Sequence, residues 1–297
     1  MTTANTFTRS SQCPGGPGLA LAALFIGLSA CATASAPSAD EQKLLDAPSP
    51  TQRANEKALA ALSGAHRAAE NKARDKYRHP APTLAFFGLQ DDFTVLELWP
   101  GGGWYTEILA PVLRDNGKLL VTSADPNGDP EDYQVKRAKE LDALFAAHPQ
   151  VYDKVGKVII DPKTLSFGSP HSVDMVLAFR SLHNWMGANV ADTVLREIYE
   201  VLKPGGTFGL VGHRGPPDTE PAGGYVSEAQ AIELVKSAGF VLAEKSELNA
   251  NPLDTKDHPK GVWTLPPNFA LGEENRDKYA AIGESDRFTL RFVKPAP

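Results

Sequence analysis

The sequence predicts an α/β protein with a doubly wound, mostly parallel, seven-stranded sheet and an N-terminal helical extension. Short apolar runs alternate along the chain with segments of helical period, as in sheets whose strands are joined by crossover helices. One run, Val173 to Phe179, is apolar almost throughout, which is typical of a strand buried on both faces. Another run ends in a glycine-rich turn and is followed by helix-forming residues.

This glycine turn lies between Val95 and Glu107, in the sequence Val-Leu-Glu-Leu-Trp-Pro-Gly-Gly-Gly-Trp-Tyr-Thr-Glu. The pattern indicates a buried strand, a tight turn and the N-terminus of a helix. Glycines there let the backbone approach a ligand that side chains would exclude, and the first N–H groups of the helix are free to face it. We therefore expect a ligand site at this turn.

The N-terminal segment has the features of an export signal. Arg9 precedes an apolar run from Leu19 to Leu28 that has signal-peptide length but is short for a membrane span. The sequence Leu-Ser-Ala-Cys that ends at Cys31 resembles the lipobox of bacterial lipoproteins, in which the cysteine is lipidated and becomes the first mature residue. Cleavage after the small residues Ala34 to Ala36 is the alternative. Both interpretations predict an exported, periplasmic protein, and the first predicts a membrane-anchored lipoprotein.

Composition narrows the classes of function. The chain has 297 residues and a formal net charge of -6 with interspersed signs, so we expect no nucleic-acid partner. Its two cysteines, Cys13 and Cys31, belong to the signal and to the predicted lipid anchor, so the body has no disulfide. Its histidines lack a recognised ligand spacing, and we predict no metal site. A small-molecule substrate is expected, and oligomeric state is not indicated.

The chain divides into a signal with the start of a tether (residues 1–36), a linker with an N-terminal helix (37–79) and a core domain (80–297). The segment from Thr51 to Arg78 has helical spacing and predicts one long helix or two shorter ones, ending at His79 and Pro80. We expect its charges to form a solvated face; a role in covering the ligand site is the alternative.

The core domain contains the predicted sheet. The predicted strands are Thr94 to Leu98, Lys118 to Ser123, Val155 to Ile160, Val173 to Phe179, Thr207 to Val211, Phe240 to Leu248 and Phe288 to Val293. The predicted helices are Thr83 to Gly88, Tyr105 to Leu113, Asp132 to Ala147, Asn189 to Leu202 and Ser227 to Gly239. A turn is predicted at Lys203 to Gly206. The segment from Asn249 to Asp286 is predicted as a long polar loop that covers a site.

The charge at the glycine turn indicates what kind of ligand binds. Glu97 ends the strand just before the turn, where its negative charge would oppose a phosphate and favour a cation. Asp125 follows the second strand and is placed to accept hydrogen bonds from ribose hydroxyls. Asp161 follows the third strand and is placed to accept one from an adenine amino group. The alternative for both aspartates is ordinary turn capping.

From about residue 80 onward the chain resembles the class I S-adenosylmethionine-dependent methyltransferases. Val95 to Gly103 is similar to their first motif, Asp125 to their ribose-binding acid, and Leu202 to Gly206 to the turn before their fifth strand. Three stretches resemble a group of bacterial predicted methyltransferases that often carry export signals: Phe86 to Gly88, Trp99 to Glu107 and Phe179 to Trp185.

The resemblance implies a Rossmann-like methyltransferase fold that binds S-adenosylmethionine. The implied cofactor-binding residues are Glu97, Trp99, Gly101, Gly103, Asp125, Asp161 and Arg180. The family usually has glycine where this chain has Trp99. The ring of Trp99 either stacks beside the cofactor or narrows its pocket.

Methyl transfer from a sulfonium needs alignment of donor and acceptor, and a base only where the acceptor must lose a proton. His183, His213 and Tyr105 are the candidate catalytic residues, because they lie at or near the predicted carboxyl edge of the sheet. A structural role is the alternative for either histidine. The rival function is a non-catalytic ligand-binding or scaffold protein that keeps this fold. A nicotinamide-dependent oxidoreductase is disfavoured by Glu97 and the glycine spacing.

Overall fold

The computed structural model describes residues 47–217 and 220–296 of the chain. These residues form the predicted seven-stranded sheet, in the order β3-β2-β1-β4-β5-β7-β6. Its strands are β1 (Thr94–Leu98), β2 (Lys118–Ser123), β3 (Gly156–Ile159), β4 (Val173–Phe179), β5 (Leu202–His213), β6 (Val241–Ser246) and β7 (Arg287–Val293). Only β7 runs antiparallel to its neighbours. The mostly parallel sheet is therefore confirmed.

The order of the strands reverses between β1 and β4. Val95 of β1 pairs with Leu119 of β2 on one side and with Met175 of β4 on the other. The connections from β1 and from β4 lead to opposite halves of the sheet, so a crevice forms outside the carboxyl ends of these two strands. This topology predicts where a ligand binds.

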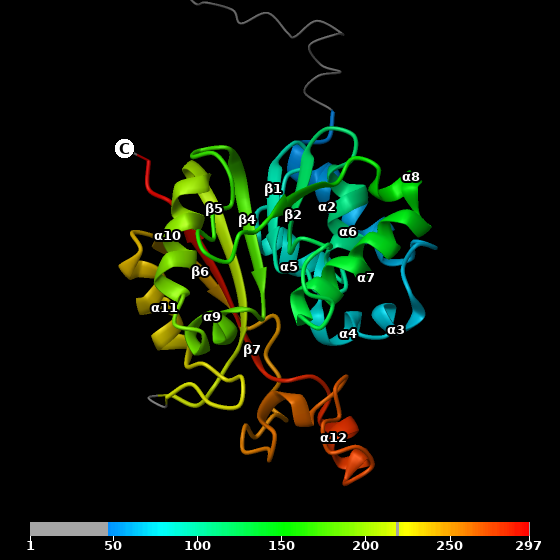
Figure 1. Ribbon diagram of the computed structural model, residues 1–297, viewed down its shortest axis with the longest axis vertical. Coiled ribbons are helices and arrows are strands. Elements are labelled where there is room, and N and C mark those ends of the chain that lie inside the picture. The colour runs from blue at the N-terminus through cyan, green and yellow to red at the C-terminus, as the bar shows by residue number, and fades with distance from the viewer. Residues whose placement is uncertain (1–46, 218–219, 297) are drawn as a thin grey trace, which may run out of the picture. The chain divides into compact units, whose positions relative to one another are not determined.

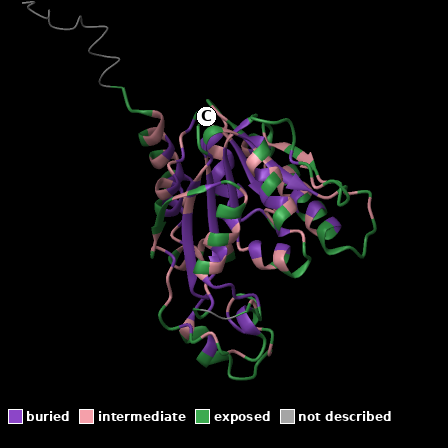
Figure 2. Cartoon of the chain, turned by 90° about the vertical axis from the view of Figure 1, so that its left-hand side faces the viewer, coloured by how far each residue is buried: buried purple, intermediate pink, exposed green. Residues whose placement is uncertain are grey.

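Helices cover both faces of the sheet (Figure 1). Those on one side are α2 (Pro50–Leu62), α5 (Pro80–Phe87), α6 (Thr106–Leu113), α7 (Tyr133–Ala147) and α8 (Pro149–Tyr152), while α9 (Leu182–Gly187), α10 (Ala191–Val201) and α11 (Glu228–Ser237) lie on the other. Two short helices, α3 (Ala69–Lys72) and α4 (Asp75–Arg78), join α2 to α5. The strands in the middle are the most buried part of the chain (Figure 2).

Alternate residues of the central strands supply two hydrophobic cores. In β1, Val95 packs with α2, α5 and α6, whereas Leu96 and Leu98 pack with α9, α10 and α11. In β4, Met175 and Leu177 belong to the same core as Val95. Because successive side chains of a strand point to opposite faces, a near-continuous apolar run is what a sheet covered on both faces requires.

The segment from Thr51 to Arg78 differs from its prediction. It forms three helices rather than one or two, and its first helix starts at a capping box made by Ser49 and Gln52. The first helix ends at Leu62, with Ser63 as its C-cap, and the next residue, Gly64, packs too closely against His66 to carry a side chain. The charges of this segment are only partly solvated: Lys76 is exposed, whereas the side chain of Arg78 is 2% exposed.

Two other segments carry more order than predicted. Lys203 to Gly206 is an irregularity inside β5 rather than a turn before it, and the register with β4 shifts there. The segment from Asn249 to Asp286 contains the 3₁₀ helix η1 (Gly261–Thr264) and α12 (Arg276–Ile282). It lies beyond the carboxyl ends of the parallel strands (Figure 1).

The predicted signal, the lipobox at Cys31 and most of the tether lie outside the described residues. In the part of the chain that the structure describes, no helix combines the length and the apolar character needed to cross a membrane.

Candidate active site

A cavity of about 830 Å³ opens at the carboxyl ends of β1 and β4, where the order of the strands reverses. This volume falls within the range of about 300 to 1,000 Å³ that is usual for small-molecule sites. Of the predicted site residues, its lining includes Glu97, Trp99, Gly101, Tyr105, Arg180, His183 and His213. The fold therefore brings seven of them together.

The two predicted glycines of the turn have different roles. Gly101 has a φ of +60°, and a Cβ built there would meet nothing within 4 Å. Gly103 has a φ of +85° and faces Leu141 and Leu144 of α7, at 3.1 and 2.8 Å from such a Cβ. Gly101 thus keeps the cavity wall open, whereas Gly103 allows the turn to pack on α7 and is not part of the cavity lining.

Glu97 is a buried acid in the cavity wall. It is 2% exposed, and its carboxylate accepts a hydrogen bond of 2.7 Å from the Thr106 hydroxyl at the start of α6. Burial raises the pKa of Glu97 to about 7 because water no longer stabilises its charge, and the bond from Thr106 only partly offsets this. A cation in the cavity would favour the ionised form of this carboxyl group.

Trp99 stands where the first-motif pattern has glycine, with a φ of 45°. Its backbone N–H donates a hydrogen bond of 2.7 Å to the Thr122 hydroxyl of β2. Its ring lies 5.7 Å from the Phe167 ring and 5.4 Å from the Trp185 ring, between centroids. Trp99 also lines a second cavity of about 180 Å³ beside the ends of β2 and β3, so its side chain forms part of the wall of both cavities.

Asp125 and Asp161 are exposed, and neither lines either of the two cavities. The Asp125 carboxylate accepts hydrogen bonds from the backbone and side chain of Asn127, and that of Asp161 accepts one from the backbone N–H of Lys163. These contacts are of the turn-capping kind. The ribose and adenine contacts of these two aspartates stay predictions.

His183 and His213 lie side by side in the cavity wall, with 5.4 Å between their ring centroids. His213 Nδ1 is hydrogen-bonded to the Ser285 hydroxyl. Burial lowers the pKa of His183 to about 4 and that of His213 well below its ordinary value, and the nearby positive charge of Arg180 adds to both shifts. Both rings are therefore neutral at pH 7, and their surroundings disfavour the positive charge that a bound proton would bring.

Tyr105 is a buried aromatic residue of the cavity wall, and its predicted catalytic role stays a prediction. Its ring stacks on Phe179 at the end of β4, with 3.5 Å between centroids and 8° between planes. Burial raises the pKa of Tyr105 to about 12, so the phenol keeps its proton at neutral pH. The stack joins the start of α6 to the end of β4 across the crevice.

The structure adds an arginine cluster that the sequence did not reveal. Glu284 accepts hydrogen bonds from the Nε atoms of Arg74 and Arg78, at 2.6 and 2.9 Å, and forms an ion pair with Arg287. Arg78 also lies over the Trp104 ring, with its Cζ 4.5 Å from the centroid. Up to 210 residues separate these partners along the chain, and no local pattern connects them.

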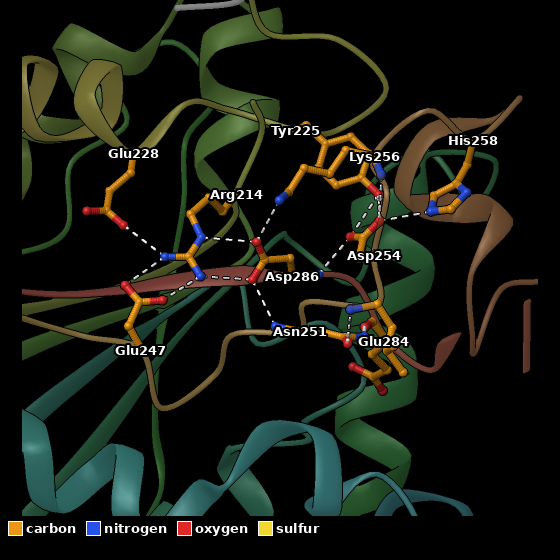
Figure 3. A network of polar contacts seen from close by, with 11 residues as sticks. Arg214, Tyr225, Glu228, Glu247, Asn251, Asp254, Lys256, His258, Glu284 and Asp286 are labelled. Atoms are coloured by element: carbon orange, nitrogen blue, oxygen red, sulfur yellow. Dashed lines mark hydrogen bonds and ion pairs between the residues drawn. The ribbon is translucent and has the colours of Figure 1, made fainter. Parts of the chain in front are cut away.

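A second polar network holds the segment from Asn249 to Asp286 in place (Figure 3). Arg214, which follows β5, donates two hydrogen bonds to Asp286, and Asp254 accepts bonds from the Tyr225 hydroxyl and from His258. The segment thus reaches the site in a defined conformation and places Trp263 in the cavity wall. Among the described residues, no group of His, Cys, Asp and Glu is arranged to hold a metal ion.

Comparisons with known proteins agree with this geometry. Residues 96–210 match the family model described as a methyltransferase domain. This part of the chain is therefore similar to a methyltransferase domain. The matched region runs from β1 into β5 and includes the glycine turn, the end of β4 and His183.

Solved structures share the superfamily fold at low sequence identity. A SAM-dependent methyltransferase from Aquifex aeolicus is 16% identical, with a TM-score of 0.50, over 75% of this chain and 93% of its own. The [4+2]-cyclase SpnF is 18% identical, with a TM-score of 0.52, over 84% of this chain and 98% of its own. A search of curated proteins gives no match.

The residues present suit S-adenosylmethionine, the cofactor that the sequence resemblance implies. A buried acid faces the cavity, and the glycine turn leaves open space beside it at Gly101. Glu97 would hold the positive charge of S-adenosylmethionine, and the backbone at Gly101 would allow its close approach. The aromatic rings of Trp99, Trp185 and Tyr105 would exclude water.

Proposed function

We propose that this protein transfers the methyl group of S-adenosylmethionine to a small-molecule acceptor in the cell envelope. The observation that carries this proposal is the cavity at the strand reversal. It joins Glu97 and the glycine turn at the end of β1 to two neutral histidines that follow β4 and β5. We infer that cofactor and acceptor both bind in this cavity.

When bound, the cofactor would supply an electrophilic methyl group. The chain's own contribution is to hold a cation at Glu97, to present aromatic walls that exclude water, and to orient an acceptor at the end of β4. Alignment of this kind provides much of the rate enhancement of a displacement reaction. If the acceptor must lose a proton, His183 and His213 are the candidate bases, because both lie in the cavity wall and are neutral at pH 7; burial weakens both as bases.

The proposed location rests on the sequence of the first 36 residues. The signal pattern supports export, and Cys31 is the proposed site of a lipid anchor. A methyltransferase in the envelope needs cofactor from the cytoplasm, so the acceptor and the cofactor must meet after export.

One observation favours a second candidate function. Trp99 occupies the first-motif position of glycine and lines both cavities, so it can limit the space left for the cofactor. The fold is shared by a protein described as a [4+2]-cyclase, so the fold alone does not establish methyl transfer. The alternative is a non-catalytic binding or scaffold protein that uses the cavity for another ligand.

Calorimetric titration of the full chain with S-adenosylmethionine and S-adenosylhomocysteine separates the two functions. We expect both compounds to bind. Glu97→Gln should lower the affinity for S-adenosylmethionine by about tenfold, because it removes a charged contact. Asp115→Asn is the matched control, because Asp115 is exposed and precedes the amino end of β2. A folded chain that binds neither compound would refute methyl transfer. Asp125→Ala, compared with the same control, tests the predicted ribose contact.

A further inference from the structure

The wall of the cavity carries more positive charge than the protein neutralises. Arg74, Arg78 and Arg180 line it, and Arg287 lies behind them. Within the described residues, Glu284 is the carboxylate that pairs with this group, and it takes bonds from three of the four arginines. The cluster therefore has an excess of buried cations.

Several hydrogen-bond donors of this cluster have no acceptor. Nη1 and Nη2 of Arg78 and Nη2 of Arg74 are buried and make no hydrogen bond with the described residues. Arg78 itself is 2% exposed. Arg180 donates its backbone N–H to Val211, but its guanidinium forms no hydrogen bond or ion pair with a described residue. Buried donors without acceptors are costly, so an arrangement that keeps several of them is suited to a ligand that supplies acceptors.

The cluster works against the stability of the folded chain. Burial and the neighbouring charge of Arg287 lower the pKa of Arg180 to about 10, and burial and Arg180 lower that of Arg78. Arg180 also has a φ of 61°, a conformation that costs energy for a residue other than glycine. Like charges held together in this way are typical of sites that bind an anion.

Arg180 lies in the same part of the cavity wall as the two candidate bases. It directly follows β4 and precedes His183 by three residues, and both line the cavity together with His213 at the end of β5. The charge of Arg180 also contributes to the lowered pKa of both histidines. Guanidinium groups bind carboxylate and phosphate oxygens with paired, charge-assisted hydrogen bonds.

We propose that Arg78 and Arg180 bind an oxyanion, a carboxylate or a phosphate, carried by the methyl acceptor. This inference rests on the proposed function and names the chemical class of its substrate. The carboxylate of the cofactor itself is the other possible source of the same chemistry. An anionic acceptor held at Arg180 would place its remaining part near His183 and His213.

Calorimetric titration of the full chain with benzoate and with inorganic phosphate tests the anion site, with benzamide as the uncharged counterpart of benzoate. We expect at least one anion to bind and benzamide to bind more weakly. Arg180→Gln should reduce anion affinity by about tenfold or more, since it removes charged hydrogen bonds. Arg114→Gln is the matched control, because Arg114 pairs with Asp153 beyond the far end of α6. Binding of neither anion, or equal binding to Arg180→Gln, would overturn the proposal.

The same titrations in saturating S-adenosylhomocysteine, which carries the cofactor's carboxylate, distinguish the two sources. Anion binding that persists supports an acceptor site, and displacement of the anion would assign the arginines to the cofactor and overturn the proposal. A chain that binds anions but not S-adenosylhomocysteine would refute the proposed function alone.

Thermal unfolding gives an independent readout of Arg180. Because its guanidinium has no hydrogen-bond or ion-pair partner among the described residues and is repelled by Arg287, Arg180→Gln should raise the unfolding temperature while anion affinity falls. A purely structural arginine would show the opposite change in stability, and a lower unfolding temperature in the variant would overturn the assignment of Arg180 to a ligand.

Discussion

The Thr106 hydroxyl donates a hydrogen bond of 2.7 Å to the Glu97 carboxylate, and both groups are buried in the wall of the cavity. The bond joins the end of β1 to the first residue of α6 across the glycine turn. It is the only polar contact of Glu97 with a side chain among the described residues, and it is not enough to keep the carboxyl group at its ordinary pKa. The turn is therefore built around an acid that a cation would ionise.

This acid makes stability depend on pH. The pKa of Glu97 is about 7 in the folded chain against 4.5 for an ordinary glutamate, so the folded state binds this proton more tightly. The stabilisation from this tighter proton binding is fully present below about pH 4.5 and is lost as the pH rises through 7. Glu97→Gln should therefore gain stability relative to the wild type by up to about 3 kcal/mol between pH 4.5 and pH 8. Urea unfolding across this range measures the difference; Asp115→Asn should show no such trend, and a pH-independent difference for Glu97→Gln would contradict the raised pKa.

The two cavity histidines should remain neutral over the physiological range. The pKa of His183 is lowered to about 4 and that of His213 well below its ordinary value, so their NMR signals should not shift between pH 5 and 8. In the urea-unfolded chain the same signals should titrate near 6.5. His183→Gln and His213→Gln assign the signals, and a folded-state midpoint near 6.5 for either ring would show that it is not buried as described.

The pH dependence of stability from these histidines has the opposite sign to that of Glu97. A lowered folded pKa means that the unfolded chain takes up the proton first, so their contribution falls as the pH drops from about 6.5 toward 4. Measurements on the wild type alone would mix the two effects. Each is isolated by the difference between a variant and the wild type.

Trp99 should act as a wall for the cofactor. We expect Trp99→Phe to keep affinity for S-adenosylhomocysteine within about threefold, and Trp99→Ala to weaken it by about tenfold through loss of aromatic contact. Calorimetry measures both. Tighter binding by Trp99→Ala would show instead that the ring narrows the pocket.

Glu284→Gln should destabilise the fold strongly. Its carboxylate pairs with Arg74, Arg78 and Arg287, and removal of its charge leaves several buried cations without a partner. The expected loss is about 3 to 5 kcal/mol in urea unfolding. Glu273→Gln is the matched control, because the Glu273 side chain is 88% exposed, and its change should stay within about 0.5 kcal/mol. Equal effects of the two changes would contradict the role of Glu284 as the shared partner.

Two cysteine variants test the predicted lipid anchor at Cys31, with Cys13 as the matched control. Cys31→Ala should release the protein from the membrane fraction, whereas Cys13→Ala should leave it there, because we expect Cys13 to be removed with the predicted signal. Fractionation after high-salt washing measures both. A Cys31→Ala chain that stays with the membrane would exclude lipidation at this residue as the anchor.

The positions of the strands were predictable to within a few residues. β1, β2 and β4 begin and end where their apolar runs do, and α11 ends where Gly239 adopts a φ of 99°. These boundaries follow from apolar periodicity and turn chemistry, which act over a few residues. The helix boundaries between Thr51 and Arg78 were not predictable, because the helical pattern continues across the two points where the helices end. The burial of Arg78 was not predictable either, because it depends on Glu284, 206 residues away.

The site residues that were predictable are those placed by the carboxyl ends of the parallel strands. Glu97, Gly101, Arg180, His183 and His213 line one cavity because parallel strands bring their carboxyl ends to one edge. Asp125 and Asp161 also follow strands, but their exposed side chains bond to their own turns instead. The direction of a side chain after a strand end depends on the loop that holds it, which no periodicity encodes.

The sequence by itself determined the sheet, the glycine turn and the acid before it, because apolar period and glycine content are local properties. The charge state of the site was decided only by the tertiary structure. Burial makes Glu97 partly neutral and keeps His183 and His213 uncharged, and the packing of α4 against the segment before β7 gathers the arginines. These effects depend on distances between residues far apart in the chain, because desolvation and Coulomb interactions act through space.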